Sequence, residues 1–151
     1  MNSWTPPVAF YFKIEFSKSS GVFDMAFQEI SGLSAEMEVE EVEEGGESRF
    51  KHQLPKRRKH GNLVCKRALV PLKDSPLGRW ARDTIDGDFS NPIETANAFI
   101  SLLDAKGNKV AGWFLSNLYP IKWQVTAFDS KKNDLAIETI EFAFNTIERK
   151  L

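Results

Sequence analysis

Residues 35–62 read AEMEVEEVEEGGESRFKHQLPKRRKHGN, an acidic segment followed by a basic one. The Gly45-Gly46 pair lies between the two halves. Such a pair between segments of alternating side chains is typical of a β-hairpin turn, because glycine takes positive φ without steric cost. The sequence therefore predicts a protruding hairpin with one acidic and one basic arm. It is either a self-neutralising, solvated ribbon or a surface that docks onto a partner.

The remaining chain has the alternation of half-buried strands. Apolar residues occupy every second position in 8–16, and further strands are expected at 23–33, 63–72, 96–103, 109–118, 121–128 and 134–147. One helix is expected at about 75–86, with Ser75 as its cap, Pro76 at its first position and Gly87 after its end. The side of this helix that carries Trp80 should be core. Many short strands with one helix predict a mainly β fold: a single β-barrel of two packed antiparallel sheets over residues 1–151, a flanking helix, and a long hairpin at about 36–54.

Composition excludes several classes of function. The chain has 151 residues and is 42% hydrophobic, which is enough to bury a core within one domain. A net charge of −1 and a pI of about 6.1 argue against a dedicated nucleic-acid binder. The lone Cys65 excludes an internal disulfide framework and is expected to be buried. No signal peptide or long apolar span is seen, so we expect a soluble protein that is made in the cytoplasm.

No catalytic or metal-binding constellation is evident. His52 and His60 lie in the charged stretch without the other donors of a ligand cluster, and we expect exposed polar side chains there. The carboxylates of 36–47 would be spread over two strand faces, which disfavours a divalent cation site. The run 56–59 (KRRK) resembles a phosphate-binding patch, but the acidic arm beside it opposes that function. We therefore expect no enzyme activity, no cofactor and no metal.

Several segments, in this order, resemble the tail-tube proteins of contractile phages and of related phage-tail-like injection systems. These segments cover almost the whole chain: 10–16 (FYFKIEF), 27–33 (FQEISGL), the Glu-rich strand ending at Gly46, Leu54-Pro55, 61–67 (GNLVCKR), Ser75-Pro76-Leu77 with Trp80, and Ala143-Phe144. Members often have a glycine after the Leu-Pro pair, where this chain has Lys56. The family is similar in fold to the haemolysin-coregulated protein of type VI secretion.

The resemblance implies a structural subunit whose homo-hexameric rings stack into a hollow tube inside a contractile sheath. The implied partners are the sheath, the baseplate and tube-terminating proteins, with a cargo protein or phage DNA passing through the lumen without sequence-specific binding. The hairpin would reach a neighbouring subunit or ring through Glu36, Met37, Glu38, Val39, Glu40, Val42, Glu43, Gly45, Gly46, Arg49, Phe50 and Lys51. Candidate ring-stacking or lumen charges are Lys56, Arg57, Arg58 and Lys59. Apolar residues of the hairpin should carry more affinity than its exposed charges, which are worth about 0–1 kcal/mol per pair.

Two alternatives stay open at this point. One is a type VI secretion ring that carries effectors, which belongs to the same structural class. The other is a monomeric barrel that encloses a small ligand. For the tube subunit we expect assembly in the cytoplasm of the producing bacterium, incorporation into a phage tail or injection particle, and no stable insertion into a membrane. Release of that particle from the cell is an open alternative.

Overall fold

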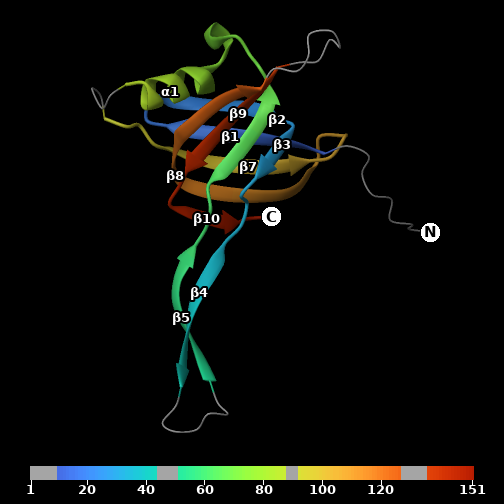
Figure 1. The fold of residues 1–151 in the computed structure, drawn as a ribbon. Coiled ribbons are helices and arrows are strands. Elements are labelled where there is room, and N and C mark those ends of the chain that lie inside the picture. Colours follow the sequence, from blue (N-terminus) through green and yellow to red (C-terminus); the bar gives the residue numbers. More distant parts are fainter. Residues whose placement is uncertain (1–9, 44–50, 88–91, 127–135) are drawn as a thin grey trace, which may run out of the picture.

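The computed structural model describes residues 10–43, 51–87, 92–126 and 136–151, and the side chains of these residues except 42–43 and 51–58. Figure 1 shows a curled β body with helix α1 across one end and a two-stranded hairpin extending from the other. The strands are β1 (Tyr11–Lys18), β2 (Gly21–Phe27), β3 (Glu29–Ser31), β4 (Glu36–Glu43), β5 (Lys51–Lys59), β6 (Leu63–Ala68), β7 (Ala96–Leu103), β8 (Lys109–Thr126), β9 (Ile137–Ala143) and β10 (Thr146–Arg149). A 3-10 turn (Leu72–Asp74) leads into α1 (Pro76–Ile85).

Two antiparallel sheets form the body and share the long strand β8. The strand order is β2-β1-β7-β8-β9-β6-β3, and β10 also pairs with β8. The first half of β8 pairs with β7 and β10, and its second half pairs with β9. The end strands β2 and β3 are separated only by Gln28, whose N–H donates to the carbonyl of Lys66 on β6 (3.0 Å). The predicted mainly β fold with two antiparallel sheets, one helix and a hairpin is confirmed.

Residues 109–126 form a single bent strand, where the sequence indicated two strands separated at 119–120. Asn117 has a φ of 53°, and the register with β9 shifts between Pro120 and Lys122. A residue in the left-handed backbone conformation, like a β-bulge, bends a strand without ending it. Proline is tolerated at such a bulge because no ladder hydrogen bond is lost there. The bend therefore carries β8 from one sheet into the other.

The core lies between the sheets and under α1. Ile14 and Phe16 of β1 are fully buried, as are Leu63 of β6 and Phe142 of β9. The Phe16 ring packs against Phe142 (centroids 5.8 Å apart) and against Trp80 of α1 (5.9 Å). The every-second-residue pattern of these strands therefore places their apolar faces inside, as period-2 side-chain alternation requires.

Helix α1 confirms the prediction for 75–86 to within a residue at each end. The Ser75 hydroxyl accepts a hydrogen bond from the Gly78 N–H (2.8 Å), and Pro76 occupies the first turn, where its missing N–H costs nothing. Leu77, Trp80 and Ala81 face the sheet and are buried. The Trp80 indole N–H donates to the carbonyl of Glu94 (2.9 Å), which fixes α1 to the segment before β7.

The hairpin forms a two-stranded sheet of its own, apart from the body (Figure 1). Its strands pair from Glu36 with Lys59 to Glu43 with Lys51, with a register shift between Met37 and Val39. Strand β5 continues to Lys59, so the hairpin is longer than the expected 36–54. The basic run 56–59 belongs to its second strand. The predicted turn at Gly45-Gly46 lies outside the described residues.

Candidate assembly surfaces

The described part of β4 presents apolar side chains to solvent between carboxylates. Met37 is 56% exposed and Val39 is 50% exposed, although both lie within a strand. Glu36, Glu40 and Glu41 are also exposed. Exposed apolar side chains on an extended strand are a feature of surfaces that pair with another chain.

Part of the acidic arm is neutralised within the hairpin. Lys59 Nζ lies 4.0 Å from Glu36 Oε2 and 3.9 Å from Glu38 Oε1. Half of the Lys59 side chain is exposed, and exposed ion pairs of this length contribute only about 0–1 kcal/mol. These contacts at the root of the hairpin do not exclude docking by the strand beyond it.

The root of the hairpin is fixed to the body. Gly32 precedes β4 at a φ of +94°, and a Cβ there would lie 2.0 Å from the carbonyl oxygen of Asn62, which follows β5. The His60 ring stacks on Phe144 (centroids 3.9 Å apart, 6° between planes). Its Nε2 lies 2.9 Å from the carbonyl oxygen of Asn145. His60, expected to be merely exposed, therefore locks β5 to the junction of β9 and β10, and Gly32 permits the close approach.

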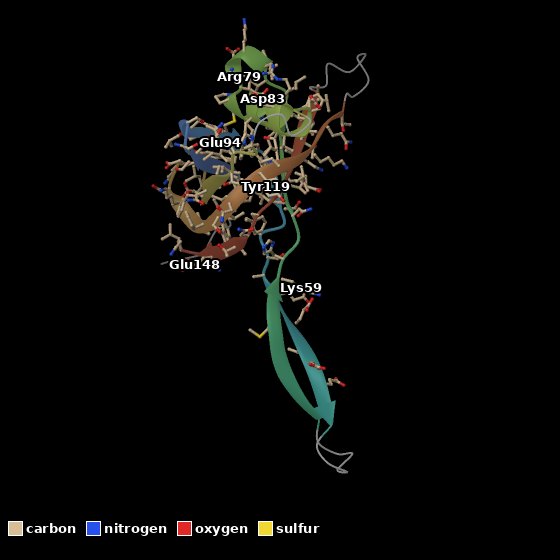
Figure 2. The ribbon with its side chains drawn as sticks, turned by 90° about the vertical axis from the view of Figure 1, so that its left-hand side faces the viewer. Lys59, Arg79, Asp83, Glu94, Tyr119 and Glu148 are labelled. Carbon is tan, nitrogen blue, oxygen red and sulfur yellow. The ribbon has the colours of Figure 1, made fainter. Side chains whose placement is uncertain are left out.

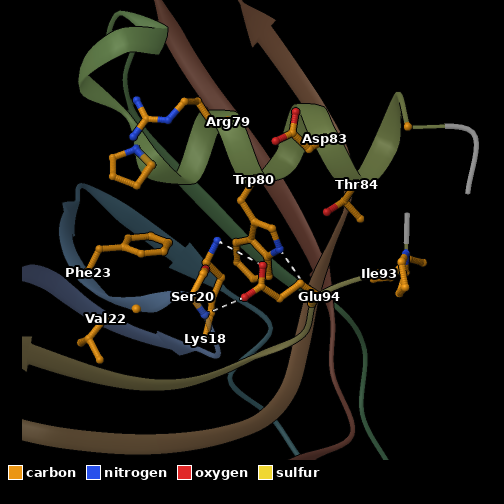
Figure 3. A pocket seen from close by; sticks show the side chains of 14 residues that line it. Lys18, Ser20, Val22, Phe23, Arg79, Trp80, Asp83, Thr84, Ile93 and Glu94 are labelled. Carbon is orange, nitrogen blue, oxygen red and sulfur yellow. Dashed lines mark hydrogen bonds and ion pairs between the residues drawn. The ribbon is translucent and has the colours of Figure 1, made fainter. Parts of the chain in front are cut away.

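A second surface is the groove beside α1, at the end of the body opposite the hairpin. Figure 3 shows Arg79 and Trp80 of α1 above it, Lys18 below, and Val22 and Ile93 on its two sides. The groove has a volume of about 590 Å³. Val22 is 65% exposed and Ile93 is 41% exposed, so its sides offer apolar contacts. No local sequence pattern predicts this groove, because its residues come from distant segments.

Glu94 organises the wall of this groove. Its Oε1 accepts from the Ser19 hydroxyl (2.8 Å) and from the Ser20 N–H (3.0 Å), and its Oε2 lies 3.8 Å from Lys18 Nζ. The Ser19 hydroxyl, followed by the Ser20 amide, holds the pKa of Glu94 below its ordinary value. Lys18 Nζ also lies 5.5 Å from the centre of the Phe23 ring and 5.2 Å from that of Trp80.

A buried polar network lies on the other side of α1. Arg67 Nε donates to Glu138 Oε2 (3.2 Å), and Arg67 Nη2 donates to the Ser75 hydroxyl (2.6 Å). The Trp123 indole N–H donates to Glu138 Oε1 (3.1 Å). The network connects β6, β8 and β9 to the cap of α1. Beside it, an apolar groove is lined by exposed Leu69, Leu72, Ile85 and Trp123.

The expected contact residues fall into three groups. The structure places Glu36, Met37, Glu38, Val39 and Glu40 together on β4, and Lys59 opposite Glu36 on β5. The backbone of Val42, Glu43, Lys51, Lys56, Arg57 and Arg58 lies in the same hairpin, but their side chains are outside the description. Gly45, Gly46, Arg49 and Phe50 lie outside the described residues. The assignment of all three groups to an intersubunit contact stays a prediction.

The described residues contain neither a cluster of metal-type ligands nor a membrane-spanning helix. Among them, no three His, Cys, Asp or Glu side chains come together as metal ligands would. No helix within these ranges combines the length and apolar content of a membrane span. The Cys65 thiol is fully buried, and desolvation raises its pKa. His52 belongs to β5, where its side chain is not described.

Comparison with known families identifies the chain. Residues 8–148 match the family model of the T4-like virus tail tube protein gp19. The chain belongs to the tail-tube family. The match covers both sheets, α1 and the hairpin, so the resemblance seen in the sequence is confirmed. No curated protein sequence matches the chain.

Solved structures agree with membership of the tail-tube family. A chain in the anti-feeding prophage (AFP) baseplate is 32% identical, with 98% of this chain and 97% of that chain covered and a TM-score of 0.80. A chain in the sheath-tube complex of the extracellular contractile injection system PVC is 21% identical (91% and 87% covered, TM-score 0.70). An Hcp protein shares the fold at 8% identity (93% and 91% covered, TM-score 0.62).

Proposed function

We propose that this chain is a structural, non-enzymatic subunit of the inner tube of a contractile injection system, with residues 1–151 acting as one domain. Six copies form a ring, and rings stack into a hollow conduit that sheath contraction drives into a target. Cargo protein or DNA passes through without sequence-specific binding. Membership of the tail-tube family and the likeness to chains from injection particles support this function.

The observation that carries the proposal is the hairpin that extends away from the body. An isolated two-stranded hairpin is marginally stable in water and needs a further surface against which to pack. Strand β4 leaves Met37 and Val39 half exposed, and these are the side chains that such packing would bury. Assembly with neighbouring copies supplies that surface. A heterologous contact of this kind closes into rings or continues into a tube, depending on its rotation.

The comparisons also support a position for the subunit within the particle. The 32% identical chain comes from a baseplate structure solved with 6-fold symmetry, whereas the chains from the PVC sheath-tube complex and the sheath/tube terminator are 21% and 20% identical. We propose that rings of this chain begin the tube at the baseplate. Sheath and terminator proteins then complete the particle. An epitope label on this chain should mark the baseplate end of purified particles, and uniform labelling along the tube would refute this position.

Negative-stain electron microscopy of the purified protein, with size-exclusion chromatography, tests the function. We expect rings or stacked rings and a mass several times that of the 17.1 kDa chain. A protein that stays monomeric at all concentrations and binds a small molecule would instead be the monomeric ligand-binding barrel. That result would refute a tube function.

A further inference from the structure

One nitrogen of Arg67 meets a sulfur atom where the other two meet oxygen atoms. Its Nε donates to Glu138 and its Nη2 to the Ser75 hydroxyl, whereas Nη1 contacts the thioether sulfur of Met25 (2.7 Å). Only 5% of Arg67 is exposed. A thioether is a weak hydrogen-bond acceptor, whereas the N–H of a charged guanidinium is a strong donor. An oxygen atom added at Met25 would therefore give Nη1 the kind of partner that the other two nitrogens have.

Met25 can also be reached from solvent. It lies on β2, an edge strand that pairs with β1 in the described part of the chain and stands at the end of the strand order. Its side chain is half-buried and lines a groove of about 610 Å³ together with Phe10, Tyr11 and Arg67. Phe10 is 43% exposed and Tyr11 is 38% exposed, so the groove opens to solvent. A small solute such as a peroxide therefore has access to it.

We propose that Met25 is a site of reversible oxidation and that Arg67 binds the sulfoxide that forms. The oxidant is a peroxide such as H2O2. A sulfur lone pair attacks one oxygen, the S–O bond forms as the O–O bond breaks, and the second oxygen takes the proton of the first and leaves as water. The sulfur is oxidised by two electrons and the peroxide is reduced by two. Methionine sulfoxide reductases reverse the step. This inference does not depend on the tube function.

The oxidised side chain suits the guanidinium better than the thioether does. The weak N–H···S contact becomes an N–H···O hydrogen bond from a charged donor. The sulfur has two lone pairs, and the contact with Nη1 leaves one of them to attack the peroxide. Methionine is unbranched and has three rotatable bonds, so the new oxygen can turn toward Nη1. A sulfoxide ordinarily disrupts apolar packing because it is polar, but here the polar group has a donor beside it.

The bond from Arg67 to the sulfoxide would strengthen the α1 end of the body. Arg67 belongs to β6 and already contacts Met25 on β2 and the Ser75 cap of α1. A stronger bond to residue 25 ties the edge strand β2 to this network. Figure 2 shows Arg79 of α1 at one end of the molecule and Lys59 on the hairpin at the other. Oxidation of Met25 therefore acts on the body and leaves the hairpin unchanged.

Tandem mass spectrometry of peptides from the full chain, after timed exposure to H2O2, tests whether the site reacts. Met37 is 56% exposed on the hairpin and serves as the internal reference for an accessible thioether. Met25 should be oxidised at a rate within roughly tenfold of the Met37 rate, although it is half-buried. A methionine sulfoxide reductase with a thiol reductant should then remove the added oxygen. A slower reaction at Met25, or a sulfoxide that the reductase does not reduce after unfolding, would overturn the proposal.

Glutamine at position 25 imitates the sulfoxide, because its amide oxygen can accept from Arg67 Nη1. Leucine is the matched apolar control. The melting temperature of Met25→Gln should exceed that of Met25→Leu by a few degrees. The order should reverse in the Arg67→Met background, because a half-buried amide without a donor is less favourable than an apolar side chain. A Met25→Gln protein that melts no higher than Met25→Leu would refute the contact, and the same order without Arg67 would assign the effect to other residues.

The melting temperature of the oxidised protein tests the sulfoxide itself. The Met25→Leu chain, treated with H2O2 in parallel, reports the effect of oxidising Met1 and Met37, the other two methionines. After correction for that effect, oxidation of Met25 should leave the melting temperature unchanged or raise it. A fall of several degrees is the result expected of a sulfoxide that finds no donor, and it would overturn the assignment to Arg67.

Discussion

Replacing Arg67 with methionine should destabilise the protomer by about 3–5 kcal/mol, because removal of one member of a buried ion pair leaves the other charge without its partner. Only 6% of the Arg67 side chain and 3% of the Glu138 side chain are exposed. Methionine fills most of the arginine volume, so the loss comes mainly from the electrostatics and only partly from a cavity. Water has little access to the Glu138 carboxylate that remains.

The double variant Arg67→Met/Glu138→Leu should recover most of this loss. Replacement of a buried pair by apolar residues of similar size is often neutral or stabilising. Here two hydrogen bonds that each involve one charged group are also removed, from Arg67 to Ser75 and from Trp123 to Glu138, and such bonds are worth about 1.5–3 kcal/mol each. Ser75 keeps its bond from the Gly78 N–H, and half-exposed Trp123 can donate to water. The double variant should therefore be more stable than Arg67→Met, and its loss of unfolding free energy should fall well below the sum of the two single losses.

Urea unfolding followed by far-ultraviolet circular dichroism measures all four members of this cycle. The urea midpoint should shift between variants while the m-value stays constant. The midpoint must also be the same at different protein concentrations, because a dependence on concentration would mean that assembly adds to the measured stability. Circular dichroism is preferred to tryptophan fluorescence because Trp123 belongs to the network. A loss below about 1 kcal/mol for Arg67→Met, or a double variant equal to the sum of the singles, would refute the coupling.

Three further predictions follow from the same contacts. Because burial raises the pKa of the Cys65 thiol, a disulfide reagent at pH 8 should not modify the folded protein but should modify one thiol per chain after unfolding; rapid reaction of the folded state would contradict this burial. The pKa of Glu94 is lowered in the folded state, so its contribution to the free energy of unfolding is present above its ordinary pKa of 4.5 and is lost as the pH falls below that value. Glu94→Gln should therefore reduce the melting temperature at pH 7 and make the melting temperature depend less on pH in the acid range. A dependence of melting temperature on pH that is the same in both proteins would exclude this role. Assembly should weaken between 0.1 and 1 M salt, where the screening length falls from about 10 to about 3 Å; pelleting that is indifferent to salt would assign the contact to Met37 and Val39 alone.

The local elements could be predicted from the sequence because their signals are local. Alternation placed Ile14 and Phe16 in the core, and the Ser75-Pro76 start located α1. Strand β8 could not be predicted as one strand, because Pro120 ordinarily interrupts a ladder and only the bulge in pairing with β9 removes that cost. The length of β5 was underestimated for a similar reason, since Pro55 and the basic run suggested a loop.

The tertiary surfaces were harder to predict because they join distant residues. Arg67 and Glu138 each fall in phase with the apolar residues of their strands, and this shared phase was a signal of a buried pair that pattern reasoning missed. The role of His60 depends on Phe144 and Asn145, more than eighty residues away along the chain. The groove beside α1 combines β1, β2, α1 and the segment before β7. The hairpin was predictable because its two strands are adjacent in the sequence.

We propose that the hairpin builds the tube and is not needed to fold the protomer. Deletion of residues 37–58, with the paired residues Glu36 and Lys59 joined through a short Gly-Ser turn, tests it most directly when the variant and the full chain are compared by negative-stain electron microscopy at equal concentration. The deletion variant should keep the circular dichroism spectrum of the β body and should form no tubes. The full chain should form rings or tubes. Tubes of normal length from the deleted chain would contradict this account.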